Sequence, residues 1–288
     1  MITPLEAGLL GAVEGLTEFL PVSSTGHLIL VAQLLRLQGE AVKTFEVVIQ
    51  AGALGAVLGL YRARVAAMGR GLLGRDAGGY QLLVKLLVSF VPAAVAGAAL
   101  HRAITRWLFS VWPVVAALVL GGVLMIGVDR WLAPARTRGW PGLAPARTRG
   151  WPGGPRRKDL TLESLTIRDA LLIGLAQCAA LWPGTSRAMA TIVAGLLLGL
   201  PARAAAEYSF LLALPTLGAA TAFELIRGGP ALIAEAGVLS MACGFAAAAV
   251  VAALAVRGFV RYLTRRGLGP FGWYRVGLGG IIWWIGHS

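Results

Sequence analysis

Six apolar segments of nearly bilayer-spanning length constrain this chain more than any other feature of its sequence. They cover residues 45–61, 82–100, 112–128, 208–226, 237–256 and 271–285. A helix that crosses a membrane needs roughly 20 mostly apolar residues. With 57% hydrophobic and only 14% charged residues among 288, the chain is more apolar than a soluble domain could bury. These features predict an all-α, polytopic integral membrane protein and exclude an ordinary soluble enzyme.

Two further apolar regions, 5–37 and 170–200, are too long and too interrupted to be simple spans. The sequence FLPVSSTGH interrupts the first at 19–27, and LWPGTSRA interrupts the second at 181–188. Proline ends a helix, and a serine or threonine can cap the next one. Each region is therefore expected to form a re-entrant hairpin, in which two helices enter and leave on the same membrane face.

The two hairpins indicate an internal duplication. Aligning Gly11 with Gly174 also pairs Ser23 with Ser186, and three apolar segments follow each hairpin. We expect a first repeat at 1–131, a cytoplasmic linker at 132–168 and a second repeat at 169–288. Because each repeat contains an odd number of spans, the second would be inverted relative to the first, and the two hairpins would meet near the membrane midplane.

Basic residues predict the orientation of the chain. Lys and Arg number 26 against 13 for Asp and Glu, but the low overall charge argues against nucleic acid as a partner. With the N-terminus outside, seventeen cations fall in cytoplasmic loops and five in outer loops, as the positive-inside rule requires. The linker repeats LAPARTRGWPG at 132–142 and 143–153, which predicts a disordered loop. We interpret the repeat as a neutral duplication, with contact to anionic lipids as the functional alternative.

Two acidic residues inside the first hairpin are the strongest candidates for a functional site, since ionisable groups are costly in hydrocarbon. Glu14 and Glu18 are one helical turn apart, where they repel each other unless a cation or a shared proton lies between them. Oxygen ligands favour Mg²⁺ or Ca²⁺, and Mg²⁺ is usually held by one or two carboxylates together with substrate phosphates. We therefore predict a divalent metal site at this pair.

A serine pair and a histidine follow the two acids. Ser23 or Ser24 would cap the return helix and leave its first N–H groups available to an anion. His27 follows the serines by four and three residues, within reach of a hydroxyl on one helical face. A serine beside a histidine is the minimal arrangement of an activated nucleophile. The first hairpin is therefore a candidate catalytic site.

The second hairpin offers a cationic counterpart. Pro183 breaks the helix and a hydroxyl residue caps the next one, so that Arg187 lies beside N–H groups that can bind a phosphate. Thr191, one turn later, adds a hydroxyl. Carboxylates and a nucleophile pair on one hairpin and an arginine on the other predict a site for phosphotransfer or phosphate hydrolysis.

The motifs EGLTEFLPVSSTGH at 14–27 and PGTSRAMAT at 183–191 resemble the two signature motifs of the undecaprenyl-diphosphatase family, the membrane phosphatases associated with bacitracin resistance. The resemblance spans the whole chain and includes FEVVIQAG at 45–52 and GLLLGLP at 195–201. It implies hydrolysis of undecaprenyl diphosphate to undecaprenyl phosphate, the lipid carrier of bacterial cell-wall synthesis. It also implies a bacterial inner-membrane protein with inverted repeats, two re-entrant hairpins and six spans.

The resemblance further implies roles for single residues. Glu14 and Glu18 match the acidic pair linked to divalent-metal binding. Ser24 matches the serine proposed as nucleophile, and His27 matches the essential histidine; whether Ser24, His27 or water attacks is left open.

The phosphate-binding part of the family site falls mainly on the second motif. Ser186, Arg187 and Thr191 match it, and we add Ser23, Thr25 and Thr185 as further substrate contacts. The usual pattern is PGxSRSGxT, whereas Ala188 and Met189 stand here in place of the second serine and the glycine. The role of that serine hydroxyl is therefore lost or is taken over, with Thr185 as the candidate.

An inverted-repeat transporter or flippase for a polyprenyl phosphate or another anion is the alternative function, because broken helices that meet at the midplane also build carriers. The paired acids and the Ser–His pair favour hydrolysis, since a carrier needs an anion site but no nucleophile. We expect a polyprenyl diphosphate and membrane lipids as partners, and we consider a homodimer as one arrangement. The first hairpin would open outward, so that the active site is reached from the periplasmic side.

Overall fold

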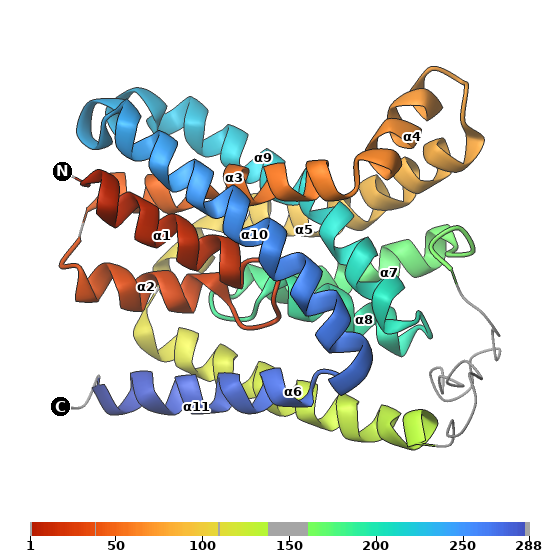
Figure 1. Cartoon of the computed structure of the whole chain (residues 1–288). Coiled ribbons are helices and arrows are strands. Elements are labelled where there is room, and N and C mark those ends of the chain that lie inside the picture. Colours follow the sequence, from red (N-terminus) through yellow and green to blue (C-terminus); the bar gives the residue numbers. More distant parts are fainter. Residues whose placement is uncertain (1, 38, 109, 138–160, 286–288) are drawn as a thin grey trace. The chain divides into compact units, whose positions relative to one another are not determined.

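In the computed structural model, the described parts of the chain are built almost entirely of helices (Figure 1). The structure describes residues 2–37, 39–108, 110–137 and 161–285, and no strand occurs among them. The predicted all-α class is thereby confirmed. Most of the predicted linker repeat, residues 138–153, lies outside the described part. The helices are α1 (Pro4–Thr17), α2 (Ser24–Leu34), α3 (Glu40–Leu60), α4 (Arg62–Leu72), α5 (Ala77–Trp107), α6 (Val111–Thr137), α7 (Ile167–Gln177), η1 (Cys178–Leu181), α8 (Arg187–Leu197), α9 (Ala202–Ala236), α10 (Val238–Arg266) and α11 (Gly269–Ile285).

Four of the described helices, α5, α6, α9 and α10, contain stretches long and apolar enough to cross a membrane. Each overlaps one of the predicted spans. The chain bends by 84° between α3 and α4, so the first predicted span, 45–61, belongs to a bent helix pair. The last predicted span, 271–285, lies on the 17-residue helix α11. These helices make the chain a multi-pass membrane protein.

The chain forms two compact units, and each unit draws on both halves of the sequence. The first comprises Met1–Tyr80 and Phe210–Phe259, and the second comprises Gln81–Ser209 and Val260–Ser288. One broken hairpin, α1–α2, belongs to the first unit, and the other, α7–α8, belongs to the second. The division into a first and a second repeat along the sequence stays a prediction.

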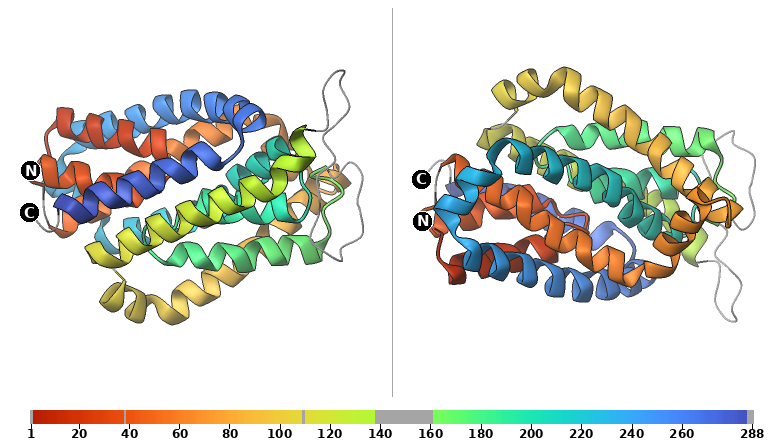
Figure 2. Two further views of the ribbon diagram at one scale, coloured as in Figure 1. Left: turned by 90° about the horizontal axis from the view of Figure 1, so that it is seen from below. Right: turned by 90° about the horizontal axis from the view of Figure 1, so that it is seen from above.

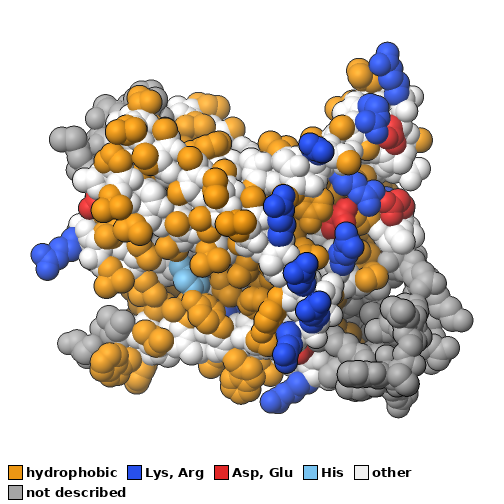
Figure 3. Space-filling view, viewed as in Figure 1, with side chains coloured by type: hydrophobic (Ala, Val, Ile, Leu, Met, Phe, Trp, Pro, Cys, Tyr) orange, Lys and Arg blue, Asp and Glu red, His pale blue; other side chains and the backbone are white. Residues whose placement is uncertain are grey.

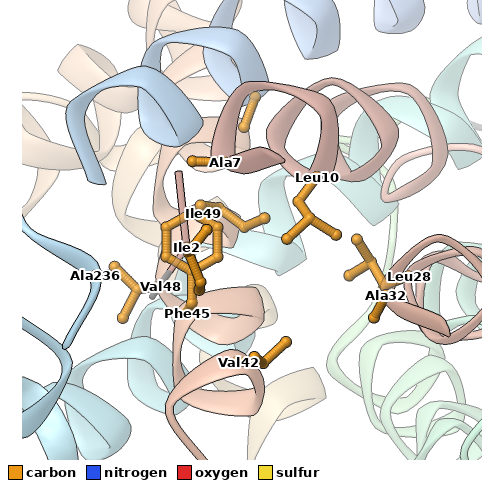
Figure 4. Close-up of a cluster of buried hydrophobic side chains, with 11 residues drawn as sticks. Ile2, Ala7, Leu10, Leu28, Ala32, Val42, Phe45, Val48, Ile49 and Ala236 are labelled. Atoms are coloured by element: carbon orange, nitrogen blue, oxygen red, sulfur yellow. The ribbon is translucent and has the colours of Figure 1, made fainter. Parts of the chain in front are cut away.

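An apolar core holds the first hairpin within its unit (Figure 4). Leu10 of α1 and Leu28 of α2 are buried in one cluster with Phe45 and Ile49 of α3. Between membrane helices, apolar side chains of this kind stabilise the structure through close van der Waals packing, because the surrounding lipid is as apolar as they are. The cluster therefore anchors both arms of the hairpin to α3.

Glycines allow α1 to pack directly against α10 in the same unit. A Cβ atom added at Gly11 would collide with the carbonyl oxygen of Gly244, and one added at Gly15 would collide with that of Ala248. Small residues let helix backbones approach closely in membrane proteins, where packing replaces the hydrophobic effect between helices. Helix α1, which ends at the two acidic residues, therefore packs against α10 with its backbone in direct contact.

In the second unit, α6 and α11 lie side by side, as Figures 1 and 2 show. A Cβ atom added at Gly122 would lie 2.7 Å from the carbonyl oxygen of Gly272, and one added at Gly272 would lie 2.7 Å from that of Gly122. The two backbones meet at this glycine pair. As a result α11 is held tightly against α6 over the region that contains Arg275.

The outer face of α10 changes from apolar to basic along the helix (Figure 3). Val250 and Leu254 are exposed, and the exposed residues Arg257, Arg261 and Arg265 follow on the same face at intervals of four. Arginine is tolerated near headgroups and water but is costly inside hydrocarbon. The C-terminal end of α10 therefore marks a membrane interface.

Candidate functional site

The first motif starts with two buried carboxylates at the end of α1. The side chain of Glu14 is fully buried, and Glu18 is 7% exposed. The N–H of Glu18 donates to the carbonyl of Glu14 at 2.9 Å, so the two residues lie one helical turn apart. Carboxylates in an apolar hairpin are stable only with hydrogen-bond donors, protons or a cation close by. These two carboxylates therefore need such partners at the end of α1.

Ser24 directs its hydroxyl to one of these carboxylates. Its Oγ donates to Oε2 of Glu18 at 2.7 Å, and both residues are buried. A hydroxyl that donates to a carboxylate at this distance forms a charge-assisted hydrogen bond. The same carboxylate is placed to take the proton if the hydroxyl becomes a nucleophile. The fold thus joins two candidate residues that stand on opposite sides of the helix break.

Ser23 forms the turn between α1 and α2 and orients His27. Its φ of 73° lies in the left-handed region, which residues other than glycine seldom adopt. The Oγ of Ser23 caps α2 by accepting from the N–H of Gly26 at 3.4 Å. Its carbonyl accepts a hydrogen bond from Nδ1 of His27 at 2.7 Å. Thr25 is half-buried in the first turn of α2.

The bond between His27 and Ser23 also determines the tautomer of the histidine ring. A carbonyl oxygen can only accept, so the neutral ring carries its proton on Nδ1 and has Nε2 as its basic nitrogen. The sequence spacing predicted that this ring would meet a serine hydroxyl. Nδ1 of His27 bonds to the backbone carbonyl of Ser23, and the Ser24 hydroxyl donates to Glu18. A contact between the ring and a serine hydroxyl stays a prediction.

The second motif contains the same unusual turn. Ser186, which the duplication pairs with Ser23, has a φ of 70° and caps α8 by accepting from the N–H of Met189 at 3.2 Å. Gly184, two residues earlier, has a φ of 95°. Two aligned serines with the same rare backbone conformation support an internal duplication. The inversion of the second repeat stays a prediction.

Arg187 is buried at the start of α8 with only 8% of its surface exposed. Its Nη1 donates to the carbonyl of Ser209 on α9 at 2.8 Å and lies 3.5 Å from the hydroxyl of the same serine. Thr191 donates from Oγ1 to that hydroxyl at 2.7 Å. A guanidinium beside the first N–H groups of a helix is suited to a phosphate.

The sequence did not single out two polar residues that contact the second motif. Ser209 joins Arg187 to Thr191, and Arg275 donates from Nη1 to the carbonyl of the buried Thr185 at 2.9 Å. Arg275 did carry a signal, because it is a lone cation within the last apolar segment. Ser209 carried none, since an isolated serine is ordinary in a membrane helix.

The structure thus assembles most candidate residues into one cluster per unit. In the first, a carboxylate–serine bond lies beside a histidine held by the backbone. In the second, an arginine and a threonine are joined through a serine. The clusters belong to different compact units, and the meeting of the two hairpins stays a prediction.

Glu14 and Glu18 are the residues that could hold a divalent cation. Among the described residues, no group of three or more His, Cys, Asp or Glu side chains is arranged to hold a metal ion. A pair of carboxylates nevertheless fits Mg²⁺, which commonly binds through one or two of them and takes its other ligands from water and substrate phosphates. The residues present fit a cation that is shared with a phosphate-bearing substrate.

Fold and site together define a multi-pass helical membrane protein whose two broken hairpins carry buried acid, serine and arginine groups. Residues 7–281 match the family described as bacitracin resistance protein BacA, and the chain belongs to this family.

Similar proteins are found in several bacteria. An undecaprenyl-diphosphatase of Sorangium cellulosum is 49% identical over 281 residues, which cover 97% of this chain and 85% of that protein. An undecaprenyl-diphosphatase of Methylococcus capsulatus is 42% identical over 98% of this chain and 95% of its own length. Undecaprenyl-diphosphatase 2 of Rhodospirillum rubrum is 40% identical over 98% of this chain and 94% of its own length. The similarity therefore extends over both units and both motifs.

Proposed function

We propose that the protein hydrolyses undecaprenyl diphosphate to undecaprenyl phosphate and inorganic phosphate. The names of its relatives support this substrate. The hydrogen bond of 2.7 Å between Ser24 and Glu18 is the observation that carries the reaction, because a carboxylate that accepts from a buried hydroxyl is placed to activate it as a nucleophile. The reaction recycles the lipid carrier of bacterial cell-wall synthesis, and the description of the family links it to bacitracin resistance.

In this proposal the first motif supplies the attacking oxygen. Either Ser24 or a water molecule attacks the terminal phosphorus, and Glu18 accepts the proton of the attacking hydroxyl. The bond between that phosphorus and the bridging oxygen breaks, and undecaprenyl phosphate leaves. If Ser24 attacks, water then hydrolyses the phosphoserine. His27, whose basic nitrogen is Nε2, donates or accepts the proton at the leaving or entering oxygen.

The second motif binds the phosphate oxygens. The guanidinium of Arg187 and the first N–H groups of α8 offer fixed positive charge, and Ser186 and Thr191 flank them. Such groups act mainly by positioning the phosphate and neutralising the charge that develops on its oxygens. Ser209 holds Arg187 and Thr191 in register.

Glu14 and Glu18 hold the divalent cation in this proposal. When bound, Mg²⁺ or Ca²⁺ would offset the charge of the diphosphate and make its terminal phosphorus easier to attack. Glu14 serves only as a ligand, whereas Glu18 also keeps the Ser24 hydroxyl in place.

Phosphate release by the purified protein in detergent tests the proposal. Glu18→Gln and Arg187→Ala are expected to lower turnover of undecaprenyl diphosphate by at least about a hundredfold, since each removes a charge that acts directly on the reacting groups. Glu224→Gln and Arg203→Ala serve as matched controls, because neither residue belongs to a motif. Turnover near that of the wild type in either site variant, with both folded, would sink the assignment.

The same assay distinguishes a hydrolase from a transporter. Release of inorganic phosphate in detergent needs no compartments, whereas a transporter or flippase moves its anion only across a sealed membrane. A wild-type protein that releases no phosphate but moves a polyprenyl phosphate between vesicle leaflets would favour the carrier.

We place the protein in the bacterial inner membrane with its active site open to the periplasmic side, on the basis of the distribution of cations between loops. A single cysteine in the 132–153 loop, introduced after Cys178 and Cys243 have been replaced, tests this orientation. Labelling of that cysteine by a membrane-impermeant reagent in intact cells would reverse it. A homodimer stays a prediction, which mass determination of the detergent-solubilised protein would check.

A further inference from the structure

Arg275, near the middle of α11, is a fully buried cation that the proposed reaction does not use. Its side chain is 0% exposed and is the largest of the fully buried side chains in the described part of the chain. Burying a guanidinium in a membrane protein is costly unless its N–H groups are matched by acceptors. The surroundings of Arg275 supply these acceptors as backbone carbonyls.

The guanidinium of Arg275 connects α11 with two other segments of the second unit. Its Nε and Nη2 donate to α6, to the carbonyls of Leu118 at 3.3 Å and Ala117 at 2.9 Å. Its Nη2 and Nη1 also donate to the carbonyls of Gly184 and Thr185, each at 2.9 Å. Gly184 and Thr185 form the tip of the second hairpin and directly precede the cap of α8.

This tip has a backbone conformation that needs external support. Gly184 has a φ of 95°, and Ser186, a residue with a side chain, has a φ of 70°. Residues in such sparsely populated regions keep their conformation only when the surrounding structure holds them there. Arg275 bonds to the carbonyls of two consecutive residues within this turn, so it holds the turn where α8 begins.

The packing of α6 leaves a space that matches the guanidinium. A Cβ atom added at Gly121 would collide with Nη2 of Arg275 and would lie 3.0 Å from its Cζ. Gly127 lies on the same helix, and a Cβ atom added there would have nothing within 4 Å. The glycine at position 121 therefore leaves room for the guanidinium of Arg275 beside the tip.

We propose that Arg275 is a positioning residue for the phosphate-binding end of α8. It acts through the tip: by fixing the carbonyls of Gly184 and Thr185, it sets the direction in which the first N–H groups of α8 and the side chain of Arg187 face the substrate. The inference rests on the proposed function, since it assumes that this end of α8 binds the diphosphate. Lysine cannot replace arginine here, because it lacks the planar set of donors that reaches two segments at once.

Two variants disturb this arrangement by different routes. Arg275→Lys keeps the charge but loses the forked geometry, and Gly121→Ala keeps the arginine but fills the space beside it. The matched controls are Arg266→Lys, at an exposed position on α10, and Gly127→Ala, on the same helix as Gly121. If Arg275→Lys does not fold, Gly121→Ala still tests the same contact with the arginine present.

Hydrogen exchange at the amides of Thr185, Met189 and Ala190, which donate hydrogen bonds within the turn and its cap, is the first measurement, and it requires no turnover. Exchange there is expected to be at least about tenfold faster in Arg275→Lys and in Gly121→Ala, since a loss of roughly this size follows from one good charge-assisted bond. Both controls are expected to match the wild type. Unchanged exchange in the two variants would overturn the inference, whether or not the protein is a diphosphatase.

Steady-state kinetics on undecaprenyl diphosphate is the second measurement. Because a displaced end of α8 weakens both the binding of the phosphate and the stabilisation of its developing charge, KM is expected to rise about tenfold, and kcat is expected to fall by less than in Arg187→Ala, which removes the charge itself. A residue that only stabilises the fold would lower kcat with the folded fraction and leave KM unchanged, and that result would overturn the inference. Kinetic constants equal to those of the wild type in variants whose amides exchange faster would also overturn the inference. A wild-type protein that releases no phosphate would instead refute the proposed function, and the exchange result would still stand.

Discussion

Removing the hydroxyl of Ser209 tests how the arginine of the second motif is held. Ser209→Ala deletes the Oγ that accepts from Thr191 at 2.7 Å but keeps the carbonyl that accepts from Arg187 at 2.8 Å. The contact between Arg187 and the hydroxyl, at 3.5 Å, is at the limit of a hydrogen bond. The substitution therefore removes one short neutral bond and leaves the main support of the guanidinium in place.

The size of the effect follows from what remains for the Thr191 hydroxyl. After the substitution this hydroxyl can still donate to the carbonyl of Arg187, at 2.9 Å, so no buried donor is orphaned. A single neutral hydrogen bond contributes about 0.5–1.5 kcal/mol, which corresponds to roughly a twofold to tenfold loss of kcat/KM. The loss should be far smaller than that of Arg187→Ala, which removes the charge itself.

A double-mutant cycle with Thr191→Val makes the test specific. Phosphate release from undecaprenyl diphosphate in detergent is measured for both single variants and for the double variant. If the two hydroxyls act mainly through each other, the double variant loses little more activity than the worse single one. The reasoning fails if Ser209→Ala is as inactive as Arg187→Ala. It also fails if the loss of activity in the double variant equals the sum, in free energy, of the losses in Ser209→Ala and Thr191→Val.

Three further outcomes are expected. Gly15→Ala should lower the stability of the protein by about 1–3 kcal/mol, because its Cβ would overlap the backbone of α10. Gly8→Ala, with nothing within 4 Å, should keep or slightly raise the thermal midpoint, since alanine favours a helix over glycine. A hydrogen bond from the N–H of Gly79, at 2.8 Å, is the main cause that lowers the pKa of Asp76. The Asp76 carboxylate therefore stabilises the α4–α5 connection fully above the ordinary carboxyl pKa of about 4. This stabilisation is lost as the pH falls through the lowered pKa of Asp76. Protection of the Gly79 amide should follow this course in the wild type and be absent at all pH values in Asp76→Ala, which has no side-chain acceptor; a Gly79 amide whose protection does not change with pH in the wild type would contradict the prediction. Chelation of divalent cations should abolish phosphate release, added Mg²⁺ or Ca²⁺ should restore it, and Glu14→Gln should need at least about tenfold more metal; full activity in a chelator would argue against the metal.

Local features of the sequence were enough to predict the class of protein and the two broken hairpins. A run of apolar residues specifies a membrane helix by its own length, and proline and capping serines act within a few residues of their positions. The same is true of Glu14 and Glu18, whose shared face follows from helical geometry alone. The motifs could therefore be found without any knowledge of what they contact.

The sequence predicted the ends of the helices less well than their presence. The predicted span 82–100 lies within α5, which runs from Ala77 to Trp107, because a helix continues past the point where its residues stop being apolar. Likewise, the 84° bend between α3 and α4 is a tertiary feature that hydropathy does not encode.

The contacts that hold the candidate site were decided by the tertiary structure. Ser209 and Arg275 lie 22 and 88 residues from Arg187 in the sequence, and only the packing of α9 and α11 brings them to the second motif. The partner of each hydroxyl in the first motif was equally undetermined, because a helix break leaves several turn geometries open. Short-range chemistry named the residues that could react, and long-range packing selected the hydrogen bonds that hold them, since those bonds depend on segments that meet only in the folded chain.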